Sequence, residues 1–152
     1  MTELSPLLDK LQRRMSNMVF QSAGLAIKAG GNALAKSVNA INAIIDDVVI
    51  AKAASDMAAL GGATVPTANY QVYVFCVDVS GNLTTLAGTY AATLAGVIWP
   101  TVPDGVAVIG FAIVQNATGS NFVPGTTALD TASLTVTYVN TSFPFIPGMA
   151  TL

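Results

Sequence analysis

Apolar residues near the start of the chain recur at steps of three and four, whereas from Tyr70 onward short runs with a period of two alternate with turn residues. The first spacing puts side chains on one face of a helix. We predict a helix over residues 4–19, with Ser5 as N-cap and Pro6 at the first helical position. Its apolar stripe consists of Leu4, Leu7, Leu8, Leu11, Met15 and Met18. An isolated helix of this length is marginal in water, so the stripe must dock against something.

Residues 22–62 allow two interpretations. Their alanine content permits a helix over residues 33–60, although asparagines interrupt it. The β-branched runs on either side of Asp46-Asp47 instead suit two strands joined by a tight turn. We favour hairpins in this region, and the helical alternative stays open.

The second half of the chain has the pattern of antiparallel β-structure. Residues 70–79 alternate between two faces and lead through a Ser-Gly-Asn turn into residues 83–87, which predicts a hairpin. Residues 106–114 are apolar on both faces, as in a central strand, and residues 133–140 form the last strand. Short strands separated by turn signals in this way indicate an antiparallel β-sandwich or barrel-like domain.

We therefore expect a mainly β protein in three parts. Residues 1–21 form an amphipathic helical segment, residues 22–142 form the β-domain, and residues 143–152 form an extended, proline-stiffened strap. Exposed apolar residues of the first and last parts are candidates for contact with sister chains or with a larger body. These candidates are Leu7, Leu11, Met15, Met18, Phe143, Phe145 and Ile146.

The composition suggests that much of the surface is used in assembly. Charged residues make up 9% of the chain and hydrophobic residues 53%, whereas an average soluble domain has roughly 25% charged residues. The apolar runs are far shorter than the ~18–20 residues of a membrane-spanning helix, and the N-terminal order of residues is not that of a signal peptide. The solvent-side residues of the strands are Thr, Ser, Asn and Ala, and sheet edges without charge invite pairing with other chains.

The distribution of functional groups argues against several kinds of partner and chemistry. All six basic residues lie in the first 52 positions, so we expect no nucleic-acid partner for the β-domain. The chain has no histidine, which is the commonest general base and metal ligand. Cys76 is the single cysteine, and its apolar neighbours predict a small core residue. We expect no metal, no cofactor and no enzymatic activity.

One motif has the letters of a catalytic site. Residues 129–132, Leu-Asp-Thr-Ala, match the apolar-Asp-Thr-Gly/Ala turn of aspartic proteases. Proteases of that family need a flap and a later apolar-apolar-Gly strand several tens of residues further on, but only residues 131–152 follow Asp130. We interpret Asp130 and Thr131 as a cap at the entry to the last strand, with side-chain oxygens that accept hydrogen bonds from local backbone N–H groups.

Several turn motifs of the second half occur together in one known group of proteins. They lie in VDVSGNLTT, TYAATLAGVIWPTVPDGVAVIGFAIVQN and NFVPGTTALDTASLTVTYVN. The shared pattern is an Asp-x-x-Gly hairpin, a Pro-x-x-Pro-x-Gly loop, an apolar strand with Ile-Gly, and Phe-x-x-Gly-Thr-Thr-x-Leu-Asp. Over roughly residues 44–140 the chain resembles a domain of virion structural proteins of tailed bacteriophages, which include head fibres, decoration proteins and tail-fibre-like proteins.

The resemblance implies a structural role on the exterior of a virion and no catalysis. We expect a homo-oligomer, with a trimer favoured, that decorates or cements a capsid or forms a head fibre, bound to the major capsid protein or another virion protein. A tail-fibre or receptor-binding module that recognises host glycan is the alternative. Its candidate stacking platform consists of Tyr70, Tyr73, Tyr90 and Trp99, although we favour packing in a core or interface for these residues.

Overall fold

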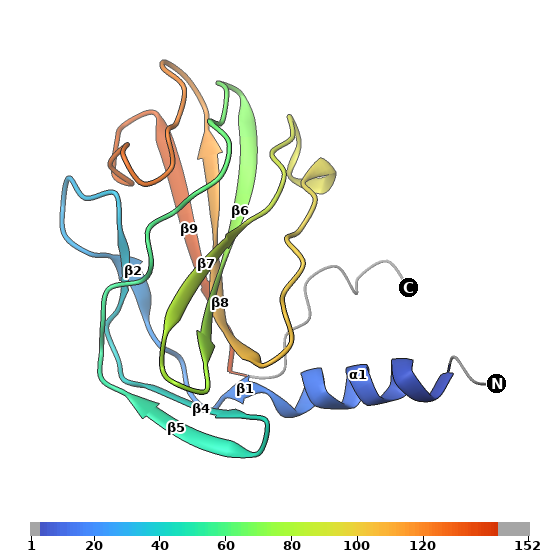
Figure 1. The fold of residues 1–152 in the computed structure, drawn as a ribbon. Coiled ribbons are helices and arrows are strands. Elements are labelled where there is room, and N and C mark those ends of the chain that lie inside the picture. Colours follow the sequence, from blue (N-terminus) through green and yellow to red (C-terminus); the bar gives the residue numbers. More distant parts are fainter. Residues whose placement is uncertain (1–3, 143–152) are drawn as a thin grey trace.

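The computed structural model describes residues 4–142, and Figure 1 shows a single long helix attached to a β-domain. The prediction of a mainly β, antiparallel domain preceded by a helix is confirmed, with 41% strand and 11% helix. The elements are α1 (Leu4–Ser16), β1 (Met18–Val19), β2 (Leu25–Ile27), β3 (Ala35–Ser37), β4 (Ile41–Ile45), β5 (Val48–Lys52), β6 (Asn69–Asp78), β7 (Leu83–Ala87), the 3₁₀ helix η1 (Leu94–Gly96), β8 (Val106–Asn116) and β9 (Leu134–Asn140). The predicted strap, residues 143–152, lies outside the described residues.

The helix is three residues shorter than the predicted range of 4–19. Its last residue, Ser16, donates a side-chain hydrogen bond to the Arg13 carbonyl oxygen. The next residue, Asn17, is buried and accepts a 2.8 Å hydrogen bond from the backbone N–H of Asp46 through its side chain. This long-range contact ends the helix, so Met18 belongs to β1, where it pairs with Ile44.

Residues 41–52 form the predicted hairpin, and the helical alternative over residues 33–60 is wrong. Ile45 pairs with Val48 across a two-residue turn. Asp46 and Asp47 have φ angles of 48° and 66°, as both central residues of a type I′ turn require. Aspartate tolerates this left-handed conformation better than most residues with a Cβ, which is why the pair suits this position.

The main sheet has the order β7-β6-β8-β9, with every neighbouring pair antiparallel. Its two central strands have the boundaries expected from the sequence to within one or two residues. Both faces of β6 are buried, and its side chains alternate between two hydrophobic cores. The predicted all-apolar strand, β8, lies next to it; one of its faces is buried, and the other is half-buried from Phe111 onward.

The larger core lies between the main sheet and a smaller sheet with the order β1-β4-β5. The inward residues of β6 in this core are Tyr73, Phe75 and Val77. The small sheet contributes alternate residues of β1 and β4, which are Val19, Ile41, Ala43 and Ile45. Within residues 4–142 the sheets do not close into a barrel.

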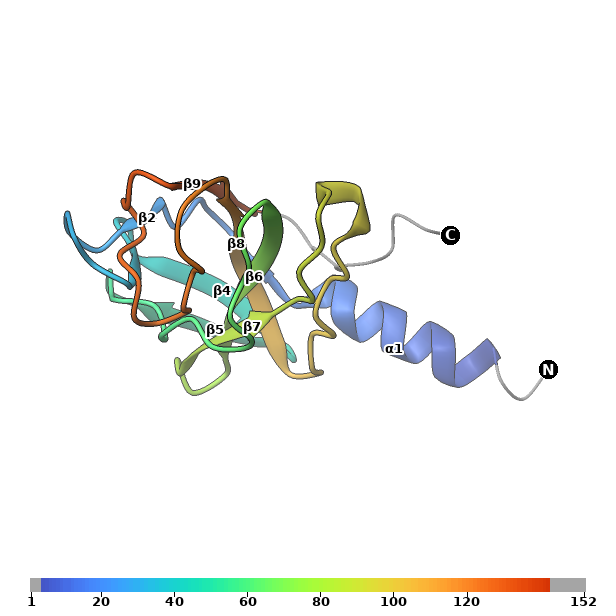
Figure 2. The ribbon, with the colours of Figure 1, turned by 90° about the horizontal axis from the view of Figure 1, so that it is seen from above.

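The second core covers the other face of the main sheet. Val72, Val74 and Cys76 of β6 pack there beneath the segment between β7 and β8, which contains η1 and lies over the sheet in Figures 1 and 2. Trp99 in this segment meets Phe111 of β8 edge to face, with ring centroids 4.9 Å apart. The prediction that Cys76 is a core residue is confirmed, and burial raises the pKa of its thiol to about 12.

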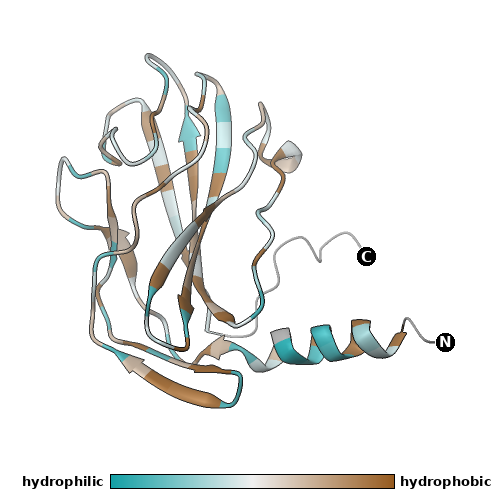
Figure 3. Cartoon of the chain, viewed as in Figure 1, coloured by the Kyte–Doolittle hydropathy of each residue, from teal (hydrophilic) through white to brown (hydrophobic). Residues whose placement is uncertain are grey.

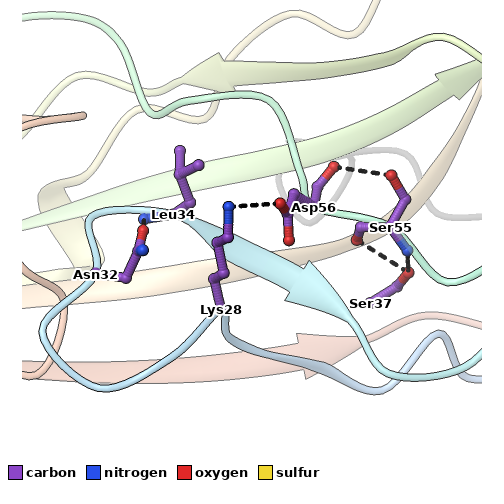
Figure 4. A network of polar contacts seen from close by, with 6 residues as sticks. All are labelled: Lys28, Asn32, Leu34, Ser37, Ser55 and Asp56. Carbon is purple, nitrogen blue, oxygen red and sulfur yellow. Dashed lines mark hydrogen bonds and ion pairs between the residues drawn. The ribbon is translucent and has the colours of Figure 1, made fainter.

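A polar network holds the β2–β3 hairpin against the strand-like segment that follows β5 (Figure 4). Lys28 Nζ lies 2.7 Å from Asp56 Oδ2, and the backbone N–H of Ser55 donates to Ser37 Oγ over 3.0 Å. Both members of the ion pair are partly exposed, so the ion pair itself contributes little. Backbone bonds such as Met57 N–H to the Ala35 carbonyl set the position of the hairpin.

The central strands also depend on one residue without a side chain. β8 bulges opposite the Phe75–Cys76 bond, and Gly110 lies at this point between β6 and β9. A Cβ at Gly110 would collide with the Val139 carbonyl oxygen and lie 2.7 Å from Leu25 Cδ1. Neither group can move without disturbing the main sheet or the larger core.

Gly110→Ala should therefore lower the free energy of unfolding by about 1–3 kcal/mol through overpacking. Gly61→Ala is the matched control, because a Cβ there meets nothing within 4 Å. Chemical denaturation of both variants measures the difference. Equal stability of the two variants would contradict the close packing of β8 against β9.

Candidate functional site

The most exposed apolar feature of the described chain is the stripe along α1. Leu4, Leu7, Leu8 and Met15 are all more than half exposed, with Leu7 at 69%, and Leu11 is half-buried. Figures 1 and 2 show that α1 projects away from the β-domain instead of lying on it. The stripe thus has the spacing of a buried helix face but no cover within residues 4–142.

The base of α1 is anchored by the Asn17 side chain. Its amide nitrogen donates to Asp46 Oδ1 over 3.5 Å, and its oxygen accepts from the Asp46 N–H. Both contacts are formed with the turn between β4 and β5. The helix is therefore anchored at its C-terminal end, and the stripe extends outward from this anchor.

The structure brings together some of the candidate contact residues. Leu7, Leu11 and Met15 lie on the stripe of α1. Met18 is half-buried and lies on β1, after the helix has ended. Phe143, Phe145 and Ile146 lie outside the described residues.

The sequence interpretation missed a second exposed apolar surface, which covers the outer face of the β1-β4-β5 sheet. We call this surface the basal face. It consists of Met18, Phe20, Ile44, Val49 and Ala51, which point away from the larger core because their strand neighbours point into it. Val49 is 66% exposed and Phe20 48%. The sequence of β4 held a signal for this face, because Ile44, at an outward position, is as apolar as its inward neighbours.

Asp130 has a structural role different in detail from the predicted one. Its carboxylate accepts a 2.7 Å hydrogen bond from the backbone N–H of Gly31, which lies in the loop between β2 and β3. Thr131 donates its hydroxyl to the Ala128 carbonyl oxygen. The prediction that these side chains accept bonds from local N–H groups is therefore wrong, because the Asp130 contact joins two distant loops.

The four aromatic residues of the alternative glycan platform do not share a surface. Tyr73 is fully buried in the larger core, where it meets Phe122 edge to face. Tyr70 and Trp99 pack against the second core on the opposite face of the sheet. Of the four, Tyr90 alone is classed as exposed, at 37%.

Metal ligands and membrane-spanning segments are two other features that a functional site could include. Among residues 4–142, no group of three or more His, Cys, Asp or Glu residues could hold a metal ion. No helix among the same residues has the length and hydropathy needed to cross a membrane.

No family model, curated protein or solved structure matches this chain.

Two measurements test the position of Asp130. The stability of the protein reports its hydrogen bond to Gly31, and the titration of Tyr138 reports its charge. The Tyr138 hydroxyl has no partner among the described residues, and its pKa is raised to about 12 by burial and, to a smaller extent, by the charge of Asp130. Asp130→Ala should lower the free energy of unfolding by about 1 kcal/mol through loss of the hydrogen bond, whereas Asp130→Asn retains an acceptor and should cost less. Chemical denaturation near neutral pH measures both.

Both substitutions remove the charge, so both should lower the pKa of Tyr138 without returning it to 10, because burial remains. A raised pKa in the folded state favours the neutral phenol, so this contribution to stability is present below pH 10 and is lost as the pH rises towards 12. Ultraviolet titration of the tyrosines measures the shift. An unchanged titration in both variants would contradict the proximity of the two side chains.

Proposed function

We propose that this protein is a structural component of a tailed-phage virion, an oligomeric decoration or head-fibre subunit that binds the repeated outer surface of the capsid. The proposal includes no catalytic role. The observation that carries it is the exposed apolar stripe of α1, held outward from a well-packed β-domain. The turn motifs that resemble phage virion proteins support the same assignment.

The stripe suits attachment to another protein surface. An amphipathic helix binds by placing its apolar face in a hydrophobic groove, with anchor residues at steps of three and four. Leu4, Leu8, Leu11 and Met15 follow such steps on α1. We assign the stripe to contact with the particle, with Leu7 at its margin.

The β-domain suits assembly into an oligomer, in which several copies of the stripe would contact the particle at once. From Ala53 to the C-terminus the chain has no Lys or Arg, so its surface there has little charge to oppose close packing of copies. Binding through several linked subunits raises the overall affinity by avidity, even where each contact is weak. A closed trimer would match threefold positions of a shell, and a trimer is the oligomer we favour.

We also propose that the main sheet and the small sheet form a β-sandwich. The inward residues of β1 and β4 and those of β6 contribute to the same core, which supports a two-layer arrangement. Such a domain presents a rigid body from which α1 extends. The glycan-binding alternative has less support, because Tyr73 lies in the larger core, Tyr70 and Trp99 pack against the second core, and Tyr90 alone is exposed.

Capsid attachment can be tested with two substitutions on the stripe. Leu7→Gln combined with Met15→Gln should weaken binding to empty capsids that lack this protein at least about tenfold, since each exposed apolar side chain contributes about 1–2 kcal/mol when it becomes buried. Cosedimentation with capsids measures the affinity. Arg13→Gln on the polar side of α1 is the control and should leave binding within about twofold.

Failure of the unaltered protein to bind capsids would overturn the proposed attachment. Equal binding by the stripe variant and the unaltered protein would instead remove α1 from the contact. The melting temperature of each variant checks that the β-domain, whose core contains neither side chain, remains folded.

A further inference from the structure

Strand β5 ends the small sheet and leaves one of its edges open. The sheet order β1-β4-β5 gives β5 a partner on one side only. In Figure 1 the strand forms the lower margin of the β-domain, and Figure 3 shows that most of it is hydrophobic. Val48 and Val49 are 48% and 66% exposed.

The hydrogen-bonding direction along β4 identifies the free groups of β5. The carbonyl of Asn42 accepts from Phe20 N–H, so Asn42 and Ile44 direct their backbone groups towards β1. Their neighbours Ile41, Ala43 and Ile45 face β5, because backbone groups alternate in direction along an antiparallel strand. Val49 and Ala51, which lie opposite Ile44 and Asn42, therefore direct N–H and C=O groups away from the sheet.

Over residues 48–51 this edge lacks the features that normally prevent pairing, and a lysine stands only at its end. Natural edge strands are protected by proline, bulges, inward-pointing charges or lysines. β5 pairs with β4 in continuous register, contains no proline and has one charged residue, Lys52, at its end. No acidic group in the described part of the chain forms an ion pair with Lys52.

We propose that β5 pairs antiparallel with β5 of a second copy of this chain across a twofold axis. The register that we propose places Val49 opposite Ala51 of the other copy. The free N–H and C=O groups of Val49 and Ala51 in the two copies then form four backbone hydrogen bonds. Ile50 lies opposite its own counterpart on the axis. Two small sheets thereby join into one continuous sheet.

The charges at the two ends of β5 favour a second copy over an unrelated strand. The strand begins after Asp46-Asp47 and ends with Lys52. Antiparallel pairing places Lys52 of each copy beside the acidic turn of the other. A twofold contact of this kind is self-complementary, so both ends of the strand are matched at once.

Pairing also makes the basal face continuous. Val49 and Ala51 belong to this face and lie next to the edge, so two basal faces meet side by side when the edges join. The contact does not depend on the proposed capsid binding. If trimers form through other surfaces, β5 joins neighbouring trimers, and the assembly contains an even number of chains.

The first test measures mass in solution. Light scattering of the purified protein should give an even-numbered assembly, and Ala51→Pro should halve its mass. The substitution removes a free N–H that the β4–β5 ladder does not use, a position where edge strands accept proline. Val49→Lys should also halve the mass, whereas Val123→Lys, at a residue 41% exposed on a distant loop, should not.

The second test reads the register directly and does not require proline to be tolerated. Ile50→Cys should form a disulfide between copies on mild oxidation, because residues opposite one another at a non-hydrogen-bonded position have Cα atoms about 4.5 Å apart. Val48→Cys on the same strand should not, because its two copies are offset by four residues, about 13 Å. The native Cys76 is buried and does not compete.

Either of two results would overturn the proposal. One is a monomer or a trimer whose mass is the same in the Ala51→Pro and Val49→Lys variants. The other is equal cross-linking of Ile50→Cys and Val48→Cys, which would indicate random collision.

Discussion

The burial of both faces of β6 is the constraint on which the rest of the fold depends. An apolar strand of this kind needs cover on each side, and the chain supplies two different covers. The small sheet packs over Tyr73, Phe75 and Val77, while the segment that contains η1 packs over the opposite face. The small sheet and the segment with η1 therefore lie on opposite faces of the central strands.

This arrangement also explains what remains uncovered. Once the two cores are filled, no described element lies over α1 or along the outer edge of β5. Each surface has a regular pattern that suits a particular kind of partner, a groove for the helix and a strand for the edge. The low charge of the chain fits the proposal that these two surfaces form separate contacts with other proteins, one for attachment and one for pairing.

The sequence predicted the elements whose signal is local. The period of two identified β6 and β8, and the Asp46-Asp47 pair identified the β4–β5 turn. The end of α1 and the role of Asp130 could not be predicted, because Asn17 contacts a turn 29 positions away and Asp130 contacts Gly31 across 99 positions. The separation of Tyr73 from Tyr70 and Trp99 likewise depends on which face of the main sheet each one packs against.

Hydrogen exchange of the purified protein, with and without empty capsids, tests most directly whether a self-contained β-domain carries an unsupported helix. We expect the amides of β6 and β8 to exchange slowest in both conditions. Those of α1 should exchange orders of magnitude faster in the free protein and become protected on capsids. Protection of α1 equal to that of β6 in the free protein would contradict this account.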